Sequence, residues 1–474
     1  MSPTRTFAVV LAIVAIACGA LAFLRSGPSV AESGDAASLD TPLWSPRRVP
    51  QPLVDAVGSQ RLQGALDAEV GDLNTCFVVD EGGAPLATHG GDAALVPAST
   101  QKILTAAAAL VVLGPEQRFV TRAVAAQAPQ DGTIEKLFLV GGGDALLMTP
   151  DVQALREEIP ELRGTPTTSM AVLAEAIVAA GVKRIPGGIA ADDTRYEAVR
   201  YLPTWDDDYR TEGQVGPLGA LTVNGGFREL RPPQPAEDPA LLATEKLGEL
   251  LEERGVDVGR GAGHEAAPPN AVEVGTVESP RLTELLGEDL STSNNLASEL
   301  LTREIGLQAS QQGTTAAGTQ AIATKLAELG VPTTNVALVD GSGLDKGNRA
   351  TCPSLAAALD LGSDPRYAIL WDGLAVAGQR GTLVDQIGGD LTGKVRGKTG
   401  TLSNASGLVG IVEVTRPLRF AFLANADMSE PAAIALRRRI VEIIATFPDA
   451  PPADELVPAP GAPAPDGSGQ DAAG

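Results

Sequence analysis

The sequence predicts an α+β protein whose antiparallel sheet is flanked by helices and interrupted by an α/β insertion. β-type runs occur early in the chain and again near its end, where a turn at 415–417 makes the last two a hairpin. Helical patterns dominate after residue 278. We expect the early and late runs to share one sheet, with residues 116–279 inserted between them. The four runs are 75–79, 85–88, 408–414 and 419–424.

Composition narrows the function classes. The chain has 474 residues, enough for two or three domains with sizeable cores. A formal net charge of −23 argues against nucleic acid as a partner. There are only two histidines, His89 and His264, and three cysteines. This excludes most zinc and iron–sulfur arrangements and leaves little room for a Ser-His-Asp triad, so we expect no metal site.

The N-terminus has the pattern of an export signal. Arg5 precedes an apolar run of 18 residues, from Phe7 to Leu24, which Arg25 closes. Because this length is at the lower edge of what spans a bilayer, residues 1–25 are either a cleaved signal peptide or a retained membrane anchor. The protein is therefore predicted to be exported and to work outside the cytoplasm, secreted or membrane-anchored.

Two segments of biased composition bound the globular part. Residues 26–48, rich in Ser, Ala, Gly and Pro, are predicted to be a linker. Residues 449–474 are predicted to be a disordered tail. Two cysteines lie in the globular part, Cys76 and Cys352. They either form a disulfide, which an oxidising compartment permits, or remain separate buried thiols.

The catalytic domain is predicted to be discontinuous, consisting of residues 49–115 and 280–448. The inserted part is expected to contain a strand at 137–140 and helices at 171–180 and 239–254. The helices expected in the catalytic domain are 54–66, 98–113, 280–289, 293–305, 314–329, 353–361 and one that begins at 430.

The chain is organised around Ser99 and Lys102. They stand at the start of the predicted helix 98–113, one helical turn apart, so both side chains lie on the same face. The rest of that helix is apolar all round, which is typical of a buried helix. A desolvated lysine loses its proton easily and can then deprotonate the adjacent serine. Alone, Ser-x-x-Lys is more often a surface helix with a solvated lysine.

A second polar motif opens the helix predicted at 293–305. Ser293 and Asn295 are placed to point toward a common cleft. The alternative interpretation is a polar N-cap, which serine and asparagine favour in any case.

A third motif, Lys398-Thr399-Gly400-Thr401, lies just before the late hairpin. Glycines on both sides of the lysine allow the backbone to approach a ligand closely, and the threonine hydroxyls can bind a carboxylate. The alternative is a twisted edge strand with a solvated lysine.

Ser-x-x-Lys, Ser-x-Asn and Lys-Thr-Gly, in this order, form the set found in β-lactamases and penicillin-binding proteins. With these motifs, residues 46–447 resemble the D-alanyl-D-alanine carboxypeptidase/endopeptidase family, the S13 peptidases or class C low-molecular-mass penicillin-binding proteins. That family also carries an insertion between its first and second motifs. One departure is Asn294, where Asp is common. Further stretches that resemble the family are 139–144, 192–194, 203–205, 221–224, 340–344, 348–349 and 377–383.

The resemblance implies a penicillin-binding, serine β-lactamase-like fold and an acyl-transfer mechanism. Ser99 is expected to be the nucleophile and Lys102 its base, kept neutral by burial and by the like charge of Lys398. Ser293 is expected to pass the proton to the leaving amine. Asn295 is expected to hold the substrate amide or to orient Lys102.

The resemblance also implies the substrate and its binding groups. The backbone N–H groups of Ser99 and Thr401 would form the oxyanion hole. Lys398, Thr399, Gly400 and Thr401 would bind the terminal D-Ala carboxylate of a peptidoglycan stem peptide. A D-Ala–diaminopimelate cross-link is the second expected substrate. β-Lactams should acylate Ser99 covalently and leave slowly, and no metal or organic cofactor is needed.

Two other functions remain open at this point. A β-lactamase shares the three motifs but must release penicillin quickly. A non-catalytic protein that binds the cell wall on the same fold is the other, since fold alone does not guarantee activity.

Overall fold

The structure, a computed structural model, describes residues 51–414 and 416–449. The predicted signal or anchor, the linker and all but the first residue of the predicted tail lie outside these residues. Within them, no helix is both long enough and apolar enough to cross a membrane. From residue 52 onward, the described residues form one compact unit.

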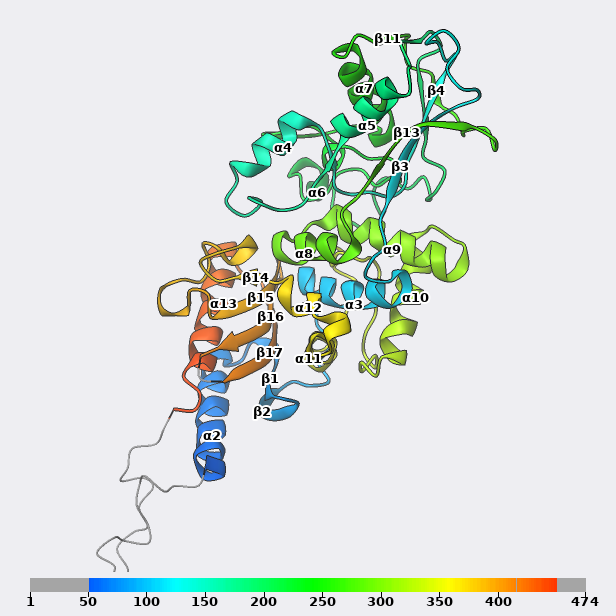
Figure 1. Cartoon of the computed structure of the whole chain (residues 1–474). Helices are drawn as coiled ribbons and strands as arrows, with labels where there is room; N and C mark the ends of the chain where they lie inside the picture. Colours follow the sequence, from blue (N-terminus) through cyan, green and yellow to red (C-terminus); the bar gives the residue numbers. More distant parts are fainter. Residues whose placement is uncertain (1–50, 415, 450–474) are drawn as a thin grey trace, which may run out of the picture. The chain divides into compact units, whose positions relative to one another are not determined.

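The central feature is a six-stranded antiparallel sheet with the order β14-β15-β16-β17-β1-β2 (Figure 1). The early and late runs share this sheet, as predicted, and Phe77 pairs with Phe422 where β1 meets β17. The strands are β1 (Asn74–Glu81), β2 (Ala84–His89), β14 (Ala375–Val376), β15 (Val395–Leu402), β16 (Ala405–Glu413) and β17 (Pro417–Asn425).

Helices cover both faces of the sheet. Successive side chains of each strand point to opposite faces, so each strand contributes apolar residues to both layers of helices. Phe420 and Phe422 pack on one face, in a cluster that also contains side chains of α2 and α13. Ala421 and Leu423 face the opposite way, toward the helices that surround α3. The helices are α2 (Gln51–Val70), α3 (Lys102–Leu113), α8 (Leu282–Thr292), α9 (Asn295–Ser310), α10 (Thr315–Glu328), α11 (Cys352–Asp360), α12 (Ile369–Asp372) and α13 (Glu430–Ala445).

The segment predicted as an insertion carries a separate five-stranded sheet, with the order β12-β8-β4-β3-β13. Its β4–β8 and β8–β12 pairs are parallel, as the α/β pattern predicts, whereas β3 pairs antiparallel with β4 and β13. Side chains of α5 and α7 complete its core.

The insertion elements follow this order: β3 (Val120–Ala125), β4 (Leu137–Val140), β5 (Leu147–Met148), α4 (Pro150–Glu157), β6 (Thr168–Ser169), α5 (Met170–Ala179), β7 (Arg184–Ile185), β8 (Ile189–Asp192), α6 (Asp208–Thr211), β9 (Phe227–Leu230), β10 (Pro233–Pro235), α7 (Pro239–Glu252), β11 (Asp257–Val258), β12 (Gly263–His264) and β13 (Val272–Glu278).

Three features differ from the sequence prediction or resolve it. Pro417 begins β17 rather than lying in the turn. The C-terminal part of the chain contributes more than the two predicted strands, because β14 and β15 extend the sheet beyond the hairpin. The glycine-rich sequence of β15 is not typical of a strand. Cys76 and Cys352 form a disulfide between β1 and α11, with a Cα–Cα distance of 5.9 Å.

Candidate active site

Ser99 and Lys102 lie on successive helical elements rather than on one helix. Ser99 belongs to η2, a 3₁₀ turn at Ala98–Gln101, and Lys102 begins α3. Ala98 has a φ of 48°. Gly343 packs so closely on this turn that a Cβ there would lie 1.9 Å from the Ala98 carbonyl oxygen. The tight turn and this close backbone contact fix the position of Ser99 at the start of the buried helix.

The Lys102 amine lies among three oxygen atoms. Its Nζ is 3.1 Å from Ser99 Oγ, 2.7 Å from Asn295 Oδ1 and 2.7 Å from the Ser342 carbonyl oxygen. The last two oxygens only accept hydrogen bonds. A neutral amine satisfies both with its two N–H groups and directs its lone pair at the Ser99 hydroxyl.

Burial favours that neutral form. Lys102 is 0% exposed, and desolvation lowers its pKa below the usual value of 10.5. Three buried carboxylates, those of Asp289, Asp340 and Glu299, oppose the shift. Desolvation nevertheless outweighs them, so the pKa of Lys102 lies below its usual value.

The carboxylate of Glu299 also shapes the site. Its Oε1 accepts hydrogen bonds from the N–H groups of Gly341 and Ser342, at 3.0 and 2.7 Å. This holds the loop whose Ser342 carbonyl faces Lys102. Burial raises the pKa of Glu299 to about 8.

The second motif forms the junction between α8 and α9. Ser293 ends α8 in the left-handed region, with a φ of 66°. Asn294 is the N-cap of α9, where its side chain accepts from Ala297 N–H. The capping role predicted as the alternative therefore falls on Asn294, which leaves Ser293 and Asn295 to line the cavity next to Ser99.

The two outer residues of this motif are used differently. Asn295 Oδ1 contacts Lys102, and its Nδ2 donates a 2.7 Å hydrogen bond to the Gln214 carbonyl. Of the two roles expected for Asn295, orienting Lys102 is the one that its contacts support. Among the described residues, the Ser293 hydroxyl forms no hydrogen bond and lines the cavity.

The third motif lies on β15, which pairs with β14 only through Arg396 and Gly397, so in the sheet residues 398–401 pair with β16 alone. The alternative of an edge strand therefore holds for the backbone of the motif, whereas its solvated lysine is wrong because Lys398 is buried. Lys398 is 0% exposed, and its Nζ donates to the Thr399 carbonyl at 2.9 Å. Burial, followed by the like charge of Lys102, lowers the pKa of Lys398 well below its usual value. The predicted effect of Lys398 on the pKa of Lys102 is not among the causes that shift Lys102, and the repulsion between the two lysines shifts the pKa of Lys398 instead.

Gly400 is required for the close packing of β15 on the turn that carries Ser99. A Cβ at this position would lie 2.8 Å from the Pro97 carbonyl oxygen and 3.0 Å from Thr100 N, in the turn that carries Ser99. The absence of a side chain lets β15 lie against that turn. Thr399 and Thr401 consequently lie beside Ser99 in the lining of one cavity.

Arg437 is a site residue that the sequence did not reveal. It lies on the buried face of α13, and its Nη1 donates to the Gly400 carbonyl and the Thr401 hydroxyl at 2.8 and 2.7 Å. Burial lowers its pKa to about 10. Arg438 and Arg439 follow it directly and are exposed, so nothing in this basic run distinguishes the buried member.

The cavity at Ser99 has a volume of about 530 Å³ and is lined by all three motifs. An acidic segment of the insertion closes another side of it. Asp206 in this segment is paired with Lys346, Nζ to Oδ2 at 2.6 Å, whereas Tyr209 donates to the Leu344 carbonyl at 3.2 Å. The insertion residues in the lining are Asp206, Asp208, Tyr209, Glu212, Gly213 and Gln214.

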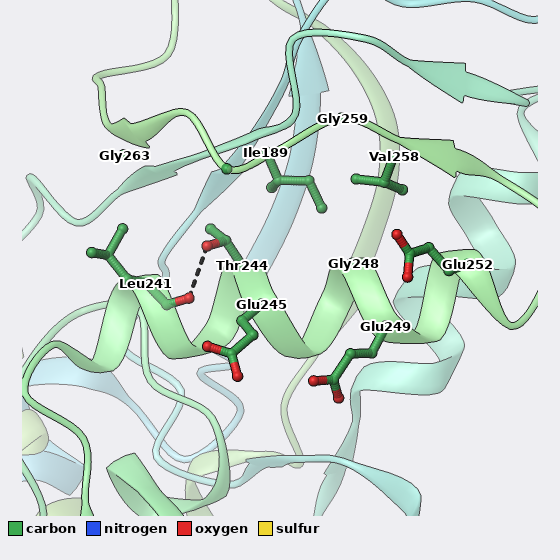
Figure 2. Close-up of a pocket in the computed structure, with 11 residues that line it drawn as sticks. Ile189, Leu241, Thr244, Glu245, Gly248, Glu249, Glu252, Val258, Gly259 and Gly263 are labelled. Atoms are coloured by element: carbon green, nitrogen blue, oxygen red, sulfur yellow. Dashed lines mark hydrogen bonds between the residues drawn. The ribbon is translucent and has the colours of Figure 1, made fainter.

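Another cavity, also about 530 Å³, lies in the insertion between α7 and residues 258–263 (Figure 2). Glu245, Glu249 and Glu252 of α7 belong to its lining, and of the three Glu252 points toward Val258 in Figure 2. It contains none of the predicted site residues, and two of its three carboxylates are paired, Glu245 with Arg228 and Glu249 with Lys246.

The fold and the three-motif site define a penicillin-binding type of protein. Among solved structures, penicillin binding protein 4 of Haemophilus influenzae is similar, with a TM-score of 0.67 and 18% identity over 81% of this chain and 99% of that one. A predatory endopeptidase of Bdellovibrio bacteriovorus, in complex with an immunity protein, has a TM-score of 0.52 and 19% identity over 80% and 93% of the two chains. These similarities concern the fold.

Sequence comparison identifies the family. The D-Ala-D-Ala carboxypeptidase 3 (S13) family matches residues 63–237 and 234–447, and this chain belongs to it. A D-alanyl-D-alanine carboxypeptidase of Actinomadura sp. (strain R39) is 29% identical, over 83% of this chain and 87% of its own length. A carboxypeptidase of Mycobacterium tuberculosis is 31% identical, over 70% and 72%. The family is one of serine hydrolases, so the chain is an enzyme of that class.

Proposed function

We propose that the protein is a serine DD-peptidase that hydrolyses the terminal D-Ala-D-Ala bond of peptidoglycan stem peptides through an acyl-Ser99 intermediate. The observation that carries this proposal is the 3.1 Å contact between Lys102 Nζ and Ser99 Oγ, made by a lysine whose pKa burial lowers. A nucleophile beside an unprotonated base is the first requirement of acyl transfer.

Acylation then proceeds from these atoms. Ser99 Oγ attacks the carbonyl carbon of the penultimate D-Ala while the lone pair of Lys102 Nζ takes its proton. The N–H groups of Ser99 and Thr401 stabilise the oxyanion of the tetrahedral intermediate, a role in which one donor contributes about 3–4 kcal/mol. Asn295 and Ser342 hold Lys102 in place through its N–H groups.

Collapse of the intermediate requires a proton on the leaving group. The Ser293 hydroxyl, which lines the same cavity, relays the proton from Lys102 to the amine of the terminal D-Ala as the C–N bond breaks. Lys398, Thr399, Gly400 and Thr401 bind the carboxylate of that D-Ala. Arg437 supports this group by donating to the backbone and side chain of β15.

Water completes the cycle by attacking the Ser99 ester, which releases the shortened peptide and restores the hydroxyl. The same chemistry would cleave a D-Ala–diaminopimelate cross-link, which is the endopeptidase activity. The residues present require no metal or organic cofactor for these steps. A β-lactam presents its carbonyl to Ser99 as the peptide does and remains attached as a slowly hydrolysed ester.

The proposed location of this reaction is outside the cytoplasm. The Cys76–Cys352 disulfide supports it because such bonds persist in oxidising compartments. Residues 1–25 would direct export, as a cleaved signal or as an anchor. Residues 116–279 would act as an inserted domain whose segment near Asp206 closes one side of the substrate cavity.

The test is covalent labelling of the purified chain with a fluorescent penicillin, followed by peptide mapping and measurement of the label's lifetime. A long-lived adduct on Ser99, lost in Ser99→Ala together with hydrolysis of a D-Ala-D-Ala peptide, is the expected result. Labelling of Ser99→Ala would remove Ser99 from its role. Rapid loss of the label would indicate a β-lactamase. No adduct on folded protein would favour a non-catalytic cell-wall-binding protein.

A further inference from the structure

A buried bridge connects the insertion to the second motif. Arg156, on α4, donates from Nη2 to Glu288 Oε1 at 2.8 Å. On the other side of the carboxylate, Asn294 Nδ2 lies 3.1 Å from Glu288 Oε2 and 3.3 Å from its Oε1. The Glu288 side chain is 1% exposed and that of Arg156 is 10% exposed.

Asn294 uses both ends of its amide. Its Oδ1 accepts from Ala297 N–H at 3.1 Å and so caps α9, while its Nδ2 donates to Glu288. An aspartate could keep the cap but has no donor at neutral pH. It would also place a second carboxylate within about 3 Å of the first, an arrangement that strongly disfavours the ionisation of both. The asparagine that departs from the family pattern is therefore matched to Glu288.

The conformation of the motif depends on its surroundings. Ser293 has a φ of 66°, which is unfavourable for a residue other than glycine. Its N–H donates to the Asp289 carbonyl at 2.8 Å, and the next residue, Asn294, is the N-cap of α9. The insertion touches the next residue as well, because Asn295 Nδ2 donates to the Gln214 carbonyl.

We propose that Arg156 and Glu288 are positioning residues, through which the insertion holds Ser293 and Asn295 in the geometry that acylation requires. Neither residue lines the cavity at Ser99 or hydrogen-bonds to Ser99 or Lys102, and the contact that joins Glu288 to the motif is the one with Asn294. The inference rests on the proposed function, since it assigns to Ser293 and Asn295 the roles given above. It also gives the insertion a part in catalysis in addition to closing the cavity.

The experiment is a reciprocal exchange at the bridge, comprising Asn294→Asp, Glu288→Gln and the two together. Penicillin acylation rate and thermal midpoint are measured for each. Asn294→Asp should slow acylation at least tenfold. Glu288→Gln should slow it as well, because the NH₂ group of the introduced amide then faces one of the two donors, Arg156 or Asn294. In the double variant, the introduced amide accepts from Arg156 and donates to the introduced carboxylate, so acylation should return to within about threefold of the original rate.

A second variant guards against the failure of Asn294→Asp to fold. Arg156→Met keeps an apolar stem but removes the charge that pairs with Glu288, and it should slow acylation at an unchanged final stoichiometry of label. Glu245→Gln is the control, because it breaks an Arg–Glu ion pair within the insertion, with Arg228, that is exposed and lies away from the site. It should label at the original rate.

The outcomes separate the two proposals. Original rates in folded Asn294→Asp and Arg156→Met, or a double variant as slow as Asn294→Asp, would overturn the positioning role. Failure of the unmodified protein to label would instead overturn the proposed function. Slow single variants that still label to the original final stoichiometry, together with a restored double variant, would establish the bridge, because a mere loss of folded protein lowers the stoichiometry of label rather than the rate.

Discussion

Arg437 donates a 2.7 Å hydrogen bond to the hydroxyl of Thr401, across the interface between the last helix and the strand that carries the third motif. The same nitrogen reaches the Gly400 carbonyl at 2.8 Å. One buried guanidinium therefore fixes both a side chain and a backbone group next to Ser99. Its pKa, lowered by burial to about 10, keeps it charged at neutral pH.

Replacement of Arg437 should weaken substrate binding. Arg437→Met retains the apolar stem but leaves the buried Gly400 carbonyl without this donor, which costs about 1–3 kcal/mol. Because Thr401 is freed at the same time, kcat/KM for a D-Ala-D-Ala peptide should fall roughly tenfold or more, a change of about 1.4 kcal/mol or more. The control is Arg438→Met, an exposed neighbour on the same helix. Equal kinetics for the two variants would contradict the role of Arg437.

The acylation rate should depend on pH through Lys102. Only the neutral amine accepts the Ser99 proton, and burial lowers the Lys102 pKa below 10.5. The labelling rate should therefore rise with pH up to that lowered pKa, reach a plateau above it, and fall about tenfold for each pH unit below it. Lys102→Met should lose roughly 10²–10⁴-fold in rate at the plateau.

Asp289 provides a directional check of this assignment. Among the carboxylates that raise the pKa of Lys102, it has the largest effect. Asp289→Asn should therefore shift the labelling profile toward lower pH. A shift toward higher pH, or no pH dependence in the unmodified protein, would argue against Lys102 as the base.

Asp144 should make stability depend on pH. Its carboxyl is buried, and desolvation raises its pKa from 3.8 to about 6, although the N–H of Leu146 donates to Oδ1 at 2.8 Å. The folded state thus holds this proton more tightly than the unfolded state. The resulting stabilisation is fully present below pH 3.8 and disappears as the pH rises through 6.

The magnitude follows from the shift. At about 1.4 kcal/mol per pKa unit, the contribution of Asp144 is about 3 kcal/mol. Urea unfolding of Asp144→Asn, whose amide does not titrate, is the comparison. The free energy of unfolding of the unmodified protein, relative to the variant, should fall by about this amount between pH 4 and pH 8. Parallel profiles for the two proteins would refute the assignment.

Loss of the disulfide should destabilise the fold. Cys76 and Cys352 are separated by 276 residues, so the bridge restricts the unfolded chain strongly. The variant Cys76→Ala/Cys352→Ala should lose about 2–5 kcal/mol of unfolding free energy in urea. Both cysteines are 0% exposed, so reductant alone should leave the native protein oxidised. An unchanged urea midpoint in the double variant would contradict this expectation.

Much of the fold and the three motifs could be predicted because their signals are local. The early strands and the late hairpin carry apolar runs of strand length, and Ser99 and Lys102 sit one turn apart on an apolar helix. The sequence suggests the strand β15 only as an alternative, because its glycines are more typical of a loop. Those glycines reflect close backbone packing, at Gly400 against the turn of Ser99.

The remaining site residues were not predicted because their roles exist only in the folded chain. Gln214 acts through its carbonyl oxygen, which every residue possesses. Arg437 is one of three consecutive arginines, and it alone of the three is buried because it lies on the face of α13 that packs against the sheet. Glu288 lies six residues before Asn294, on the preceding helix, and a turn in the left-handed region brings the two side chains together.

The pairing of β1 with β17 has a consequence for biosynthesis. Asn425 binds the backbone N–H of Val96 through Oδ1 and its carbonyl through Nδ2, although the two residues are 329 positions apart. The segment leading to Ser99 is therefore held by strands that leave the ribosome late. A nascent chain that has not reached β17 lacks the middle of its sheet, and contacts of such long range form slowly. Acylating activity should appear only after translation and translocation have delivered both halves of the sheet to the same compartment.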